Sequence, residues 1–188
     1  VGHQEKISWL LEQAKRGELP SALIFQGPEG IGKKLIAKSL LQVMNCPDSE
    51  RACGQCSNCK RALEDKNELV YILEPEGKKT IGVDQVREIH SFLNLKSLRP
   101  ARFIIIDPAD KLTIPAANSL LKVLEESPEK TYFILVTEKM RGLLPTILSR
   151  FHSSKFDPLT KEELQSFKSF EAIALTWSDG GLQLAIEL

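Results

Sequence analysis

The hydrophobic positions change their period along the chain, and each change marks an expected element. The first apolar positions recur at helical spacing, which predicts an amphipathic helix around Ile7, Leu10, Leu11 and Ala14. A short apolar run at 22–25 then predicts a strand, and Gly27 begins a glycine-rich turn. From Lys33 to Met44 the helical period returns. The pattern therefore predicts a strand, a glycine-rich loop and a helix in succession.

Apolar runs and helical patterns keep alternating after this unit. Further strands are expected at 69–73, at 102–107 and at 132–136, with helices around 83–93 and 116–124. The run at 102–107 is uninterrupted until it ends in Asp107, which is typical of a central parallel strand buried on both faces. Strands that alternate with helices of this length predict an α/β fold, with a right-handed parallel sheet sandwiched by helices.

The glycine-rich turn nearly fits the phosphate-binding P-loop pattern G-x-x-x-x-G-K-[ST]. Gly27, Gly30 and Gly32 would let backbone N–H groups approach phosphate oxygens at a helix N-terminus, and Lys33 would reach the β- and γ-phosphates. An ordinary glycine-rich turn is the alternative, but the preceding strand and the following helix supply the context that the motif requires. The last position departs from the pattern: Lys34 stands where a hydroxyl should ligate Mg²⁺, and an ammonium repels a cation.

Four cysteines lie close together in the chain and predict a metal site. Cys46, Cys53, Cys56 and Cys59 have the spacing C-x6-C-x2-C-x2-C. Two overlapping C-x2-C steps can wrap thiolates around one tetrahedral Zn²⁺ ion, with the first ligand at the end of the preceding helix. We predict a closed, structural zinc knuckle inserted at 46–59, against the alternative of four free structural cysteines.

The composition changes near Phe156, and this change divides the chain. Asp157-Pro158 forms a break, and Thr160 and Glu163 have capping-box spacing, so a new helix is expected there. We predict a P-loop nucleotide-binding-type domain at 1–156 and a small helical lid at 157–188. The chain stops without an evident terminal tail, which leaves open whether it belongs to a longer protein.

Charge and hydropathy limit the classes of partner. The 188 residues hold 25 basic and 25 acidic side chains and are 42% hydrophobic, so a core is expected and a basic whole-domain field for nucleic acid is not. No apolar run approaches the roughly 18 residues of a membrane span, and no signal peptide is visible. We therefore expect a cytoplasmic protein without a membrane contact.

Together these motifs resemble the bacterial replicative clamp loaders of DNA polymerase III, in the AAA+ superfamily. The start at 1–4 resembles the family's opening motif near the adenine pocket, and the cysteine module is a family hallmark. The run 116–128, AANSLLKVLEESP, resembles the signature helix. Thr137 takes the sensor 1 position after a strand, and 143–150 resembles the run into the Ser-Arg-Cys motif. Phe151 replaces the family's usual cysteine and leaves Arg150 intact.

The resemblance implies catalytic roles for several residues and also shows which catalytic groups of the family are missing here. Asp107 would help to hold Mg²⁺, but Pro108 follows where AAA+ ATPases carry a glutamate base, and Asp110 is expected to point elsewhere. The family implies that Arg150 is an arginine finger acting in trans on ATP held by a neighbouring subunit; a surface ion pair is the alternative. We therefore expect no intrinsic ATPase activity, while nucleotide binding without Mg²⁺ and an empty loop filled by Lys34 both stay open.

Three functions remain to be separated. The main hypothesis is a non-hydrolysing delta-prime-type subunit, which helps to load the sliding clamp onto primed DNA with gamma/tau and delta-type partners. A gamma/tau-type motor is the alternative within the family, but it needs a Ser or Thr at Lys34 and a Glu at Pro108. A zinc-dependent DNA-binding module is the third possibility, and the balanced charge opposes it. The family's C-terminal oligomerisation domain has no counterpart here, so the chain alone is expected to be monomeric.

Overall fold

The computed structural model describes residues 3–48, 52–64, 67–77, 79–94 and 101–158. Its centre is a five-stranded sheet in the order β2-β3-β4-β1-β5, and all neighbouring strands are parallel. The strands are β1 (Ala22–Gln26), β2 (Val70–Leu73), β3 (Arg102–Ile106), β4 (Thr131–Thr137) and β5 (His152–Lys155).

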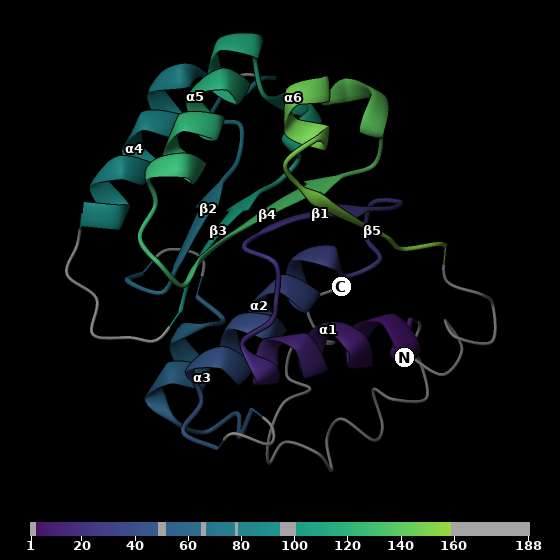
Figure 1. Cartoon of the computed structure of the whole chain (residues 1–188), viewed down its shortest axis with the longest axis vertical. Helices are drawn as coiled ribbons and strands as arrows, with labels where there is room; N and C mark the ends of the chain where they lie inside the picture. The colour runs from purple at the N-terminus through teal and green to yellow at the C-terminus, as the bar shows by residue number, and fades with distance from the viewer. Residues whose placement is uncertain (1–2, 49–51, 65–66, 78, 95–100, 159–188) are drawn as a thin grey trace.

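Helices cover both faces of this sheet (Figure 1). On one face lie α1 (Gln4–Arg16), α2 (Lys33–Asn45) and the short α3 (Ser57–Arg61), and on the other lie α4 (Val83–Asn94), α5 (Ile114–Glu126) and α6 (Pro145–Leu148). Two 3₁₀ turns, η1 (Ala109–Lys111) and η2 (Met140–Gly142), complete the described elements. The fold is therefore a three-layer α/β sandwich.

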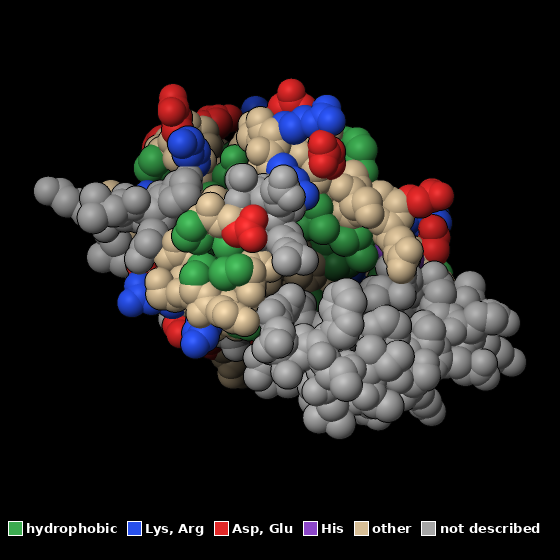
Figure 2. Space-filling view, turned by 90° about the horizontal axis from the view of Figure 1, so that it is seen from below, with side chains coloured by type: hydrophobic (Ala, Val, Ile, Leu, Met, Phe, Trp, Pro, Cys, Tyr) green, Lys and Arg blue, Asp and Glu red, His purple; other side chains and the backbone are tan. Residues whose placement is uncertain are grey.

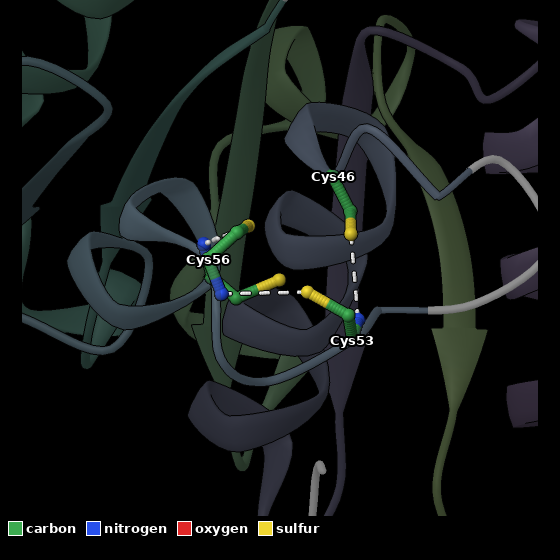
Figure 3. Close-up of side chains that lie close together, drawn as sticks. Cys46, Cys53 and Cys56 are labelled. Carbon is green, nitrogen blue, oxygen red and sulfur yellow. Dashed lines mark hydrogen bonds between the residues drawn. The ribbon is translucent and has the colours of Figure 1, made fainter.

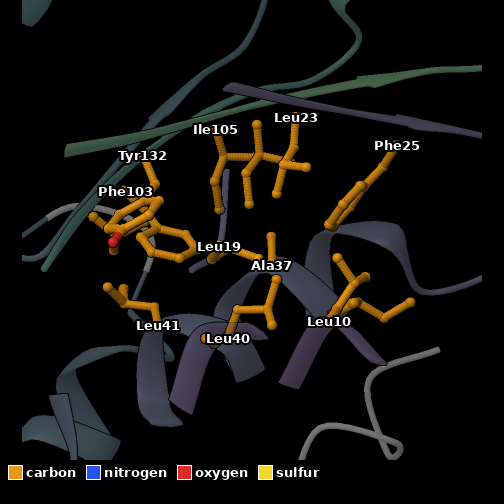
Figure 4. Packing of buried hydrophobic residues seen from close by; sticks show 14 of the residues in the cluster. Leu10, Leu19, Leu23, Phe25, Ala37, Leu40, Leu41, Phe103, Ile105 and Tyr132 are labelled. Carbon is orange, nitrogen blue, oxygen red and sulfur yellow. The ribbon is translucent and has the colours of Figure 1, made fainter. Parts of the chain in front are cut away.

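Each face of the sheet has its own hydrophobic core. Figure 4 shows Leu10 of α1 and Leu41 of α2 packed toward Phe25 and Phe103 of the sheet, and all four side chains are fully buried. A second cluster on the opposite face joins Val86 of α4, Leu120 of α5 and the strand residues Ile104 and Leu135. Strand residues of β1 and β3 alternate between the two cores, because successive side chains of a strand point to opposite faces.

The predicted α/β class and parallel sheet are confirmed, and β3 is an inner strand as expected. The fifth strand, β5, was missed by the sequence reasoning. Its sequence His-Ser-Ser-Lys is polar and largely exposed, because β5 is an edge strand, so no apolar run signals it. The lid predicted at 157–188 falls, from residue 159 on, outside the described residues.

The parallel arrangement separates the candidate residues into two groups. The carboxyl ends of all strands meet at one edge of the sheet, so the loop after β1, Asp107 after β3 and Thr137 at the end of β4 share that edge. His152 pairs with Leu23 near the start of β1, which places Arg150, two residues earlier, toward the opposite, amino-terminal edge. Arg150 and the glycine loop thus belong to opposite edges of one sheet.

Candidate functional site

The glycine loop has the backbone conformation that its glycines permit. Gly30 and Gly32 adopt φ values of 77° and 86°, in the left-handed region where a side chain is strained, and α2 begins directly after Gly32. At Gly27 the reason is close approach, since an added Cβ would lie 2.3 Å from the carbonyl oxygen of Phe156. The Gly27 N–H also donates to the Thr137 carbonyl at 3.0 Å, which ties the loop to β4.

Lys33 engages the loop's own backbone. Its side chain is only 6% exposed, and Nζ donates to the carbonyl oxygens of Gly27 at 2.8 Å and Pro28 at 2.5 Å. Burial lowers the pKa of Lys33, against the opposing pull of the Asp107, Glu138 and Glu29 carboxylates. The ammonium that would hold phosphate oxygens is therefore satisfied by backbone carbonyls.

An acidic side chain accepts a hydrogen bond from one of the loop's backbone N–H groups. The Glu29 N–H donates to Oε1 of Glu138 at 3.0 Å, and Glu138 follows directly after β4. A carboxylate oxygen is an anionic acceptor of the kind that a phosphate would offer to such a loop. Glu138 was not among the predicted site residues, since nothing in its local pattern distinguishes it from any exposed acid.

Lys34 lies between two carboxylates at the same edge of the sheet. Its Nζ is 2.5 Å from Oε1 of Glu74 and 3.7 Å from Oδ2 of Asp107. Burial raises the pKa of Asp107, while Lys34 lowers it and Glu74 raises it again. The structure thus puts an ammonium beside the carboxylate that was expected to help hold Mg²⁺.

The turn after β3 brings Asp110 to the sensor-position threonine. The fully buried Thr137 donates from Oγ1 to Oδ1 of Asp110 at 3.0 Å, and the Lys139 N–H donates to the same hydroxyl at 3.1 Å. Asp110 was expected to point elsewhere, but its carboxylate reaches the sensor-position threonine, because η1 folds back toward η2 and the end of β4. The hydroxyl of Thr137 is therefore engaged by the chain itself, and Pro108 offers no side-chain base.

The four cysteines converge on one point. The sulfur atoms of Cys46, Cys53, Cys56 and Cys59 all lie within 4.8 Å of one another. Figure 3 shows the labelled side chains of Cys46, Cys53 and Cys56 gathered close together. Ligands at about 2.3 Å from a tetrahedral zinc are roughly 3.8 Å apart, so the group fits a metal of that kind after small shifts. The four cysteines could therefore hold one metal ion.

Backbone donors favour thiolates in this cluster. The N–H groups of Cys53, Cys56 and Cys59 donate to the sulfur atoms of Cys46, Cys53 and Cys56 at 3.3–3.4 Å. The donation from Cys56 is the main cause that lowers the pKa of Cys53 to about 6, while burial raises the pKa of Cys59. Because a metal binds the deprotonated sulfur, these N–H donors suit a ligand set.

Buried polar side chains of α2 hold the cysteine module in place. Gln42 donates to the Cys59 carbonyl at 3.0 Å, and the Asn45 carbonyl accepts from the Asn58 amide at 2.7 Å. Asn45 also exchanges two hydrogen bonds with the backbone of Ala101, which leads into β3. The sequence reasoning missed these residues, since buried polar positions in an amphipathic helix look like its solvated face.

Arg150 is exposed, with 45% of its side chain accessible. Its Nε lies 3.4 Å from Oε1 of Glu125 on α5, and one terminal nitrogen donates to the Thr146 carbonyl at 3.4 Å. These long, solvent-screened contacts contribute little to stability. A guanidinium with five donor hydrogens therefore keeps the capacity to bind an oxyanion outside the chain.

The described part of one face of the molecule shows no field of a single charge sign. On the face seen in Figure 2, acidic and basic side chains are interspersed over the part of the surface that is described. Among the described residues, no helix has the length and apolar character needed to cross a membrane.

Comparison with known proteins shows which families and proteins this chain resembles. The profile of the family described as DNA polymerase III, delta subunit, matches residues 2–160. DNA polymerase III subunit delta' of Escherichia coli K12 is 35% identical over 180 residues, which cover 94% of this chain and 52% of the relative. The delta' subunit of Bacillus subtilis 168 is 33% identical over 159 residues, covering 83% and 48%. The gamma/tau subunit of Mycobacterium tuberculosis H37Rv is 31% identical over 159 residues, covering 83% and 28%.

Solved structures agree with these sequence matches. A DNA polymerase III gamma subunit-related protein from Thermotoga maritima has a TM-score of 0.60 and 26% identity, covering 90% of this chain and 54% of the other. The RuvB Holliday junction branch migration motor of the same organism has a TM-score of 0.56 at 20% identity, covering 91% and 50%, which shows a shared fold alone. This chain spans about half the length of the delta' relatives.

Proposed function

Because the chain belongs to the DNA polymerase III delta subunit family of AAA+ clamp-loader proteins, we propose that it acts as a delta'-type subunit. In this role it helps to load the sliding clamp onto primed DNA during replication, without hydrolysing ATP itself. The observation that carries the proposal is the ammonium of Lys34 placed beside Asp107, where an ATPase needs Mg²⁺. The higher identity to delta' than to gamma/tau relatives supports the same choice.

Loss of hydrolysis follows from two missing groups. Lys34 supplies no oxygen ligand for Mg²⁺, and Pro108 supplies no base to orient the attacking water. Lys33, Glu138 and Thr137 each engage another part of the chain, so the loop is satisfied without phosphate. ATP or ADP at Gly27, Gly30, Gly32 and Lys33 is therefore not needed to hold this site together.

Arg150 is the residue that we propose acts on ATP bound to a neighbouring subunit. Arg150 belongs to the edge of the sheet opposite the glycine loop, which supports a role outside the chain's own loop, on an adjacent subunit. Its guanidinium would approach the γ-phosphate of ATP on that subunit and stabilise the charge that develops in the transition state. Gamma/tau-type and delta-type subunits are the proposed partners, and the clamp and DNA are reached through the assembled complex.

The remaining parts support this role structurally. We propose that Cys46, Cys53, Cys56 and Cys59 hold one Zn²⁺ as a closed site that fixes the module beside α2 and α3. The domain division at 156/157, with a helical lid following, stays a proposal. A gamma/tau-type motor remains the second candidate, because the loop keeps three glycines and Lys33 in a P-loop backbone.

Reconstitution tests the proposed function. The natural protein, mixed with gamma/tau-type and delta-type subunits, should co-elute with them and raise clamp-loading and DNA-dependent ATPase rates of the complex. Alone with MgATP it should release no phosphate above a protein-free control. Turnover by the protein alone would instead establish the motor, and failure to join the complex would remove the clamp-loader role.

A further inference from the structure

We propose that Glu125 is an internal competitor for the guanidinium of Arg150. Its carboxylate binds the guanidinium at the amino-terminal edge of the sheet, and it must be displaced before the phosphates of ATP on a neighbouring subunit bind the same group. The inference rests on the proposed trans role of Arg150 and deepens it, because it says which group of this chain the guanidinium leaves when it binds phosphate.

Two helices supply the groups that contact the Arg150 side chain. Glu125 lies in the last turn of α5, and its Oε1 is 3.4 Å from Nε of Arg150. Thr146 lies in α6, and its carbonyl oxygen accepts a hydrogen bond of 3.4 Å from Nη1. The backbone of Arg150 is held more tightly, since its N–H donates at 3.0 Å to the carbonyl of Ile147, a fully buried residue. The fold therefore fixes the start of the side chain, whereas longer contacts hold its charged end.

The charge at the end of α5 favours a cation at this point. The last two residues of the helix are Glu125 and Glu126, and its last turn holds no basic residue. A helix C-terminus carries a partial negative charge, so it disfavours both carboxylates and attracts a positive group. Arg150 brings that positive group from another segment, and it pairs with Glu125. The contact therefore follows from the local charge as well as from the distance.

The ion pair is weak enough to be exchanged. The side chain of Glu125 is 61% exposed and that of Arg150 is 45% exposed, so water screens their attraction. A phosphate accepts two parallel charge-assisted hydrogen bonds from a guanidinium, which a single carboxylate oxygen at 3.4 Å does not match. Phosphate therefore displaces the carboxylate, and the lost ion pair is part of the free-energy cost of binding ATP at the adjoining site.

The KM for ATP of the reconstituted loader tests the inference. Glu125→Gln removes the competing charge at nearly the same size, so KM should fall about two- to fivefold, the range that an exposed ion pair allows, while kcat changes less than about twofold. Glu126→Gln is the matched control, because it removes the same charge from the same helix turn without breaking the ion pair. Its KM should stay within about 1.5-fold of the unmodified value. A merely structural role of Glu125 would instead weaken assembly or lower kcat.

Solvent exchange of the Arg150 Nε–H provides a second readout that does not depend on the loader. It is followed by NMR in the natural protein alone at mildly acidic pH, with the signal assigned by its absence from Arg150→Lys. Glu125→Gln should accelerate the exchange several-fold, because the carboxylate lies at this N–H and repels hydroxide. An unchanged exchange rate, a KM that does not fall, or an equal fall with Glu126→Gln would overturn the inference and leave the finger role in place. If Arg150→Ala leaves the ATPase rate of the loader unchanged, the proposed trans role fails, and this inference fails with it.

Discussion

The two edges of the sheet treat their charged residues in opposite ways. At the carboxyl-terminal edge, Lys33 and Lys34 are directed at backbone carbonyls and carboxylates of the same chain. At the amino-terminal edge, Arg150 is exposed, and within the described part of the chain its side chain is held only by long contacts to Glu125 and Thr146. The lysines at the carboxyl-terminal edge thus bind groups of their own chain, whereas the guanidinium of Arg150 at the amino-terminal edge is exposed and can bind a group outside the chain.

If the proposed function holds, this difference explains how a P-loop fold can be retained without ATP hydrolysis. The loop keeps its glycines because the fold uses them: Gly27 admits the backbone of Phe156, and Gly32 starts α2. Hydrolysis needs groups that the fold does not use, namely a metal ligand and a base, and those are the ones missing at Lys34 and Pro108. In the proposed function, Arg150 is retained because it acts on ATP bound to a neighbouring subunit.

The largest expected effect is at Arg150. Arg150→Ala should lower the ATPase rate of the assembled loader at the adjoining site by about 10³-fold, because an arginine finger stabilises the transition-state charge. Arg150→Lys should recover little, since it lacks the planar fork. Steady-state phosphate release checks this, with the exposed Arg141→Ala as control. An unchanged rate with an intact complex would remove the finger role.

Gly27 should show that the loop's first glycine serves packing. Gly27→Ala places a Cβ 2.3 Å from the Phe156 oxygen, so the free energy of unfolding should fall by about 3 kcal/mol. Gly82→Ala is the matched control, since nothing lies within 4 Å of its added Cβ, and its change should stay within about 0.5 kcal/mol. Urea unfolding measures both, and equal stabilities would refute the packing reason.

Lys33 should matter for stability more than for catalysis. Lys33→Met loses the hydrogen bonds to Gly27 and Pro28, which should cost about 1–2 kcal/mol of unfolding free energy. The ATPase of the assembled loader should fall less than about threefold, in contrast to the loss expected at an active P-loop lysine. Lys15→Met, at an exposed position of α1, controls for the substitution itself.

The smallest effect is expected at Asp107. Burial raises its pKa above 3.8, so the folded state holds this proton more tightly than the unfolded state does. The contribution to stability is therefore present at low pH and is lost as pH rises through the two pKa values. Asp107→Asn should flatten the stability profile just above pH 3.8 and leave the unfolding free energy at neutral pH within about 0.5 kcal/mol. Urea unfolding across this range checks the sign, and a steeper profile would contradict it.

Local patterns were sufficient for the α/β class, the first four strands and the glycine loop. The apolar runs of β1, β3 and β4 reflect burial on both faces, which the sequence displays directly. The cysteine cluster was equally visible, because its spacing lies within one short segment and the structure brings the four sulfur atoms together.

Contacts between distant segments could not be predicted in the same way. Asp110 meets Thr137 across 27 residues and Lys34 meets Glu74 across 40, and both pairs depend on which strands are neighbours in the sheet. β5 was missed because a polar edge strand carries no hydrophobic period. Gln42 and Asn45 were missed because their partners are backbone groups of other segments.

The ratio of two ATPase rates separates a role at a neighbour's ATP from a role at the chain's own glycine loop. In one reconstituted loader assay, the rate with Lys33→Met is divided by the rate with Arg150→Ala, after both complexes are shown to assemble. If the chain serves a neighbour's ATP and not its own, this ratio should be at least about 10², given the size of arginine-finger effects. A ratio near or below one would show that the glycine loop, and not Arg150, carries the chain's contribution to hydrolysis.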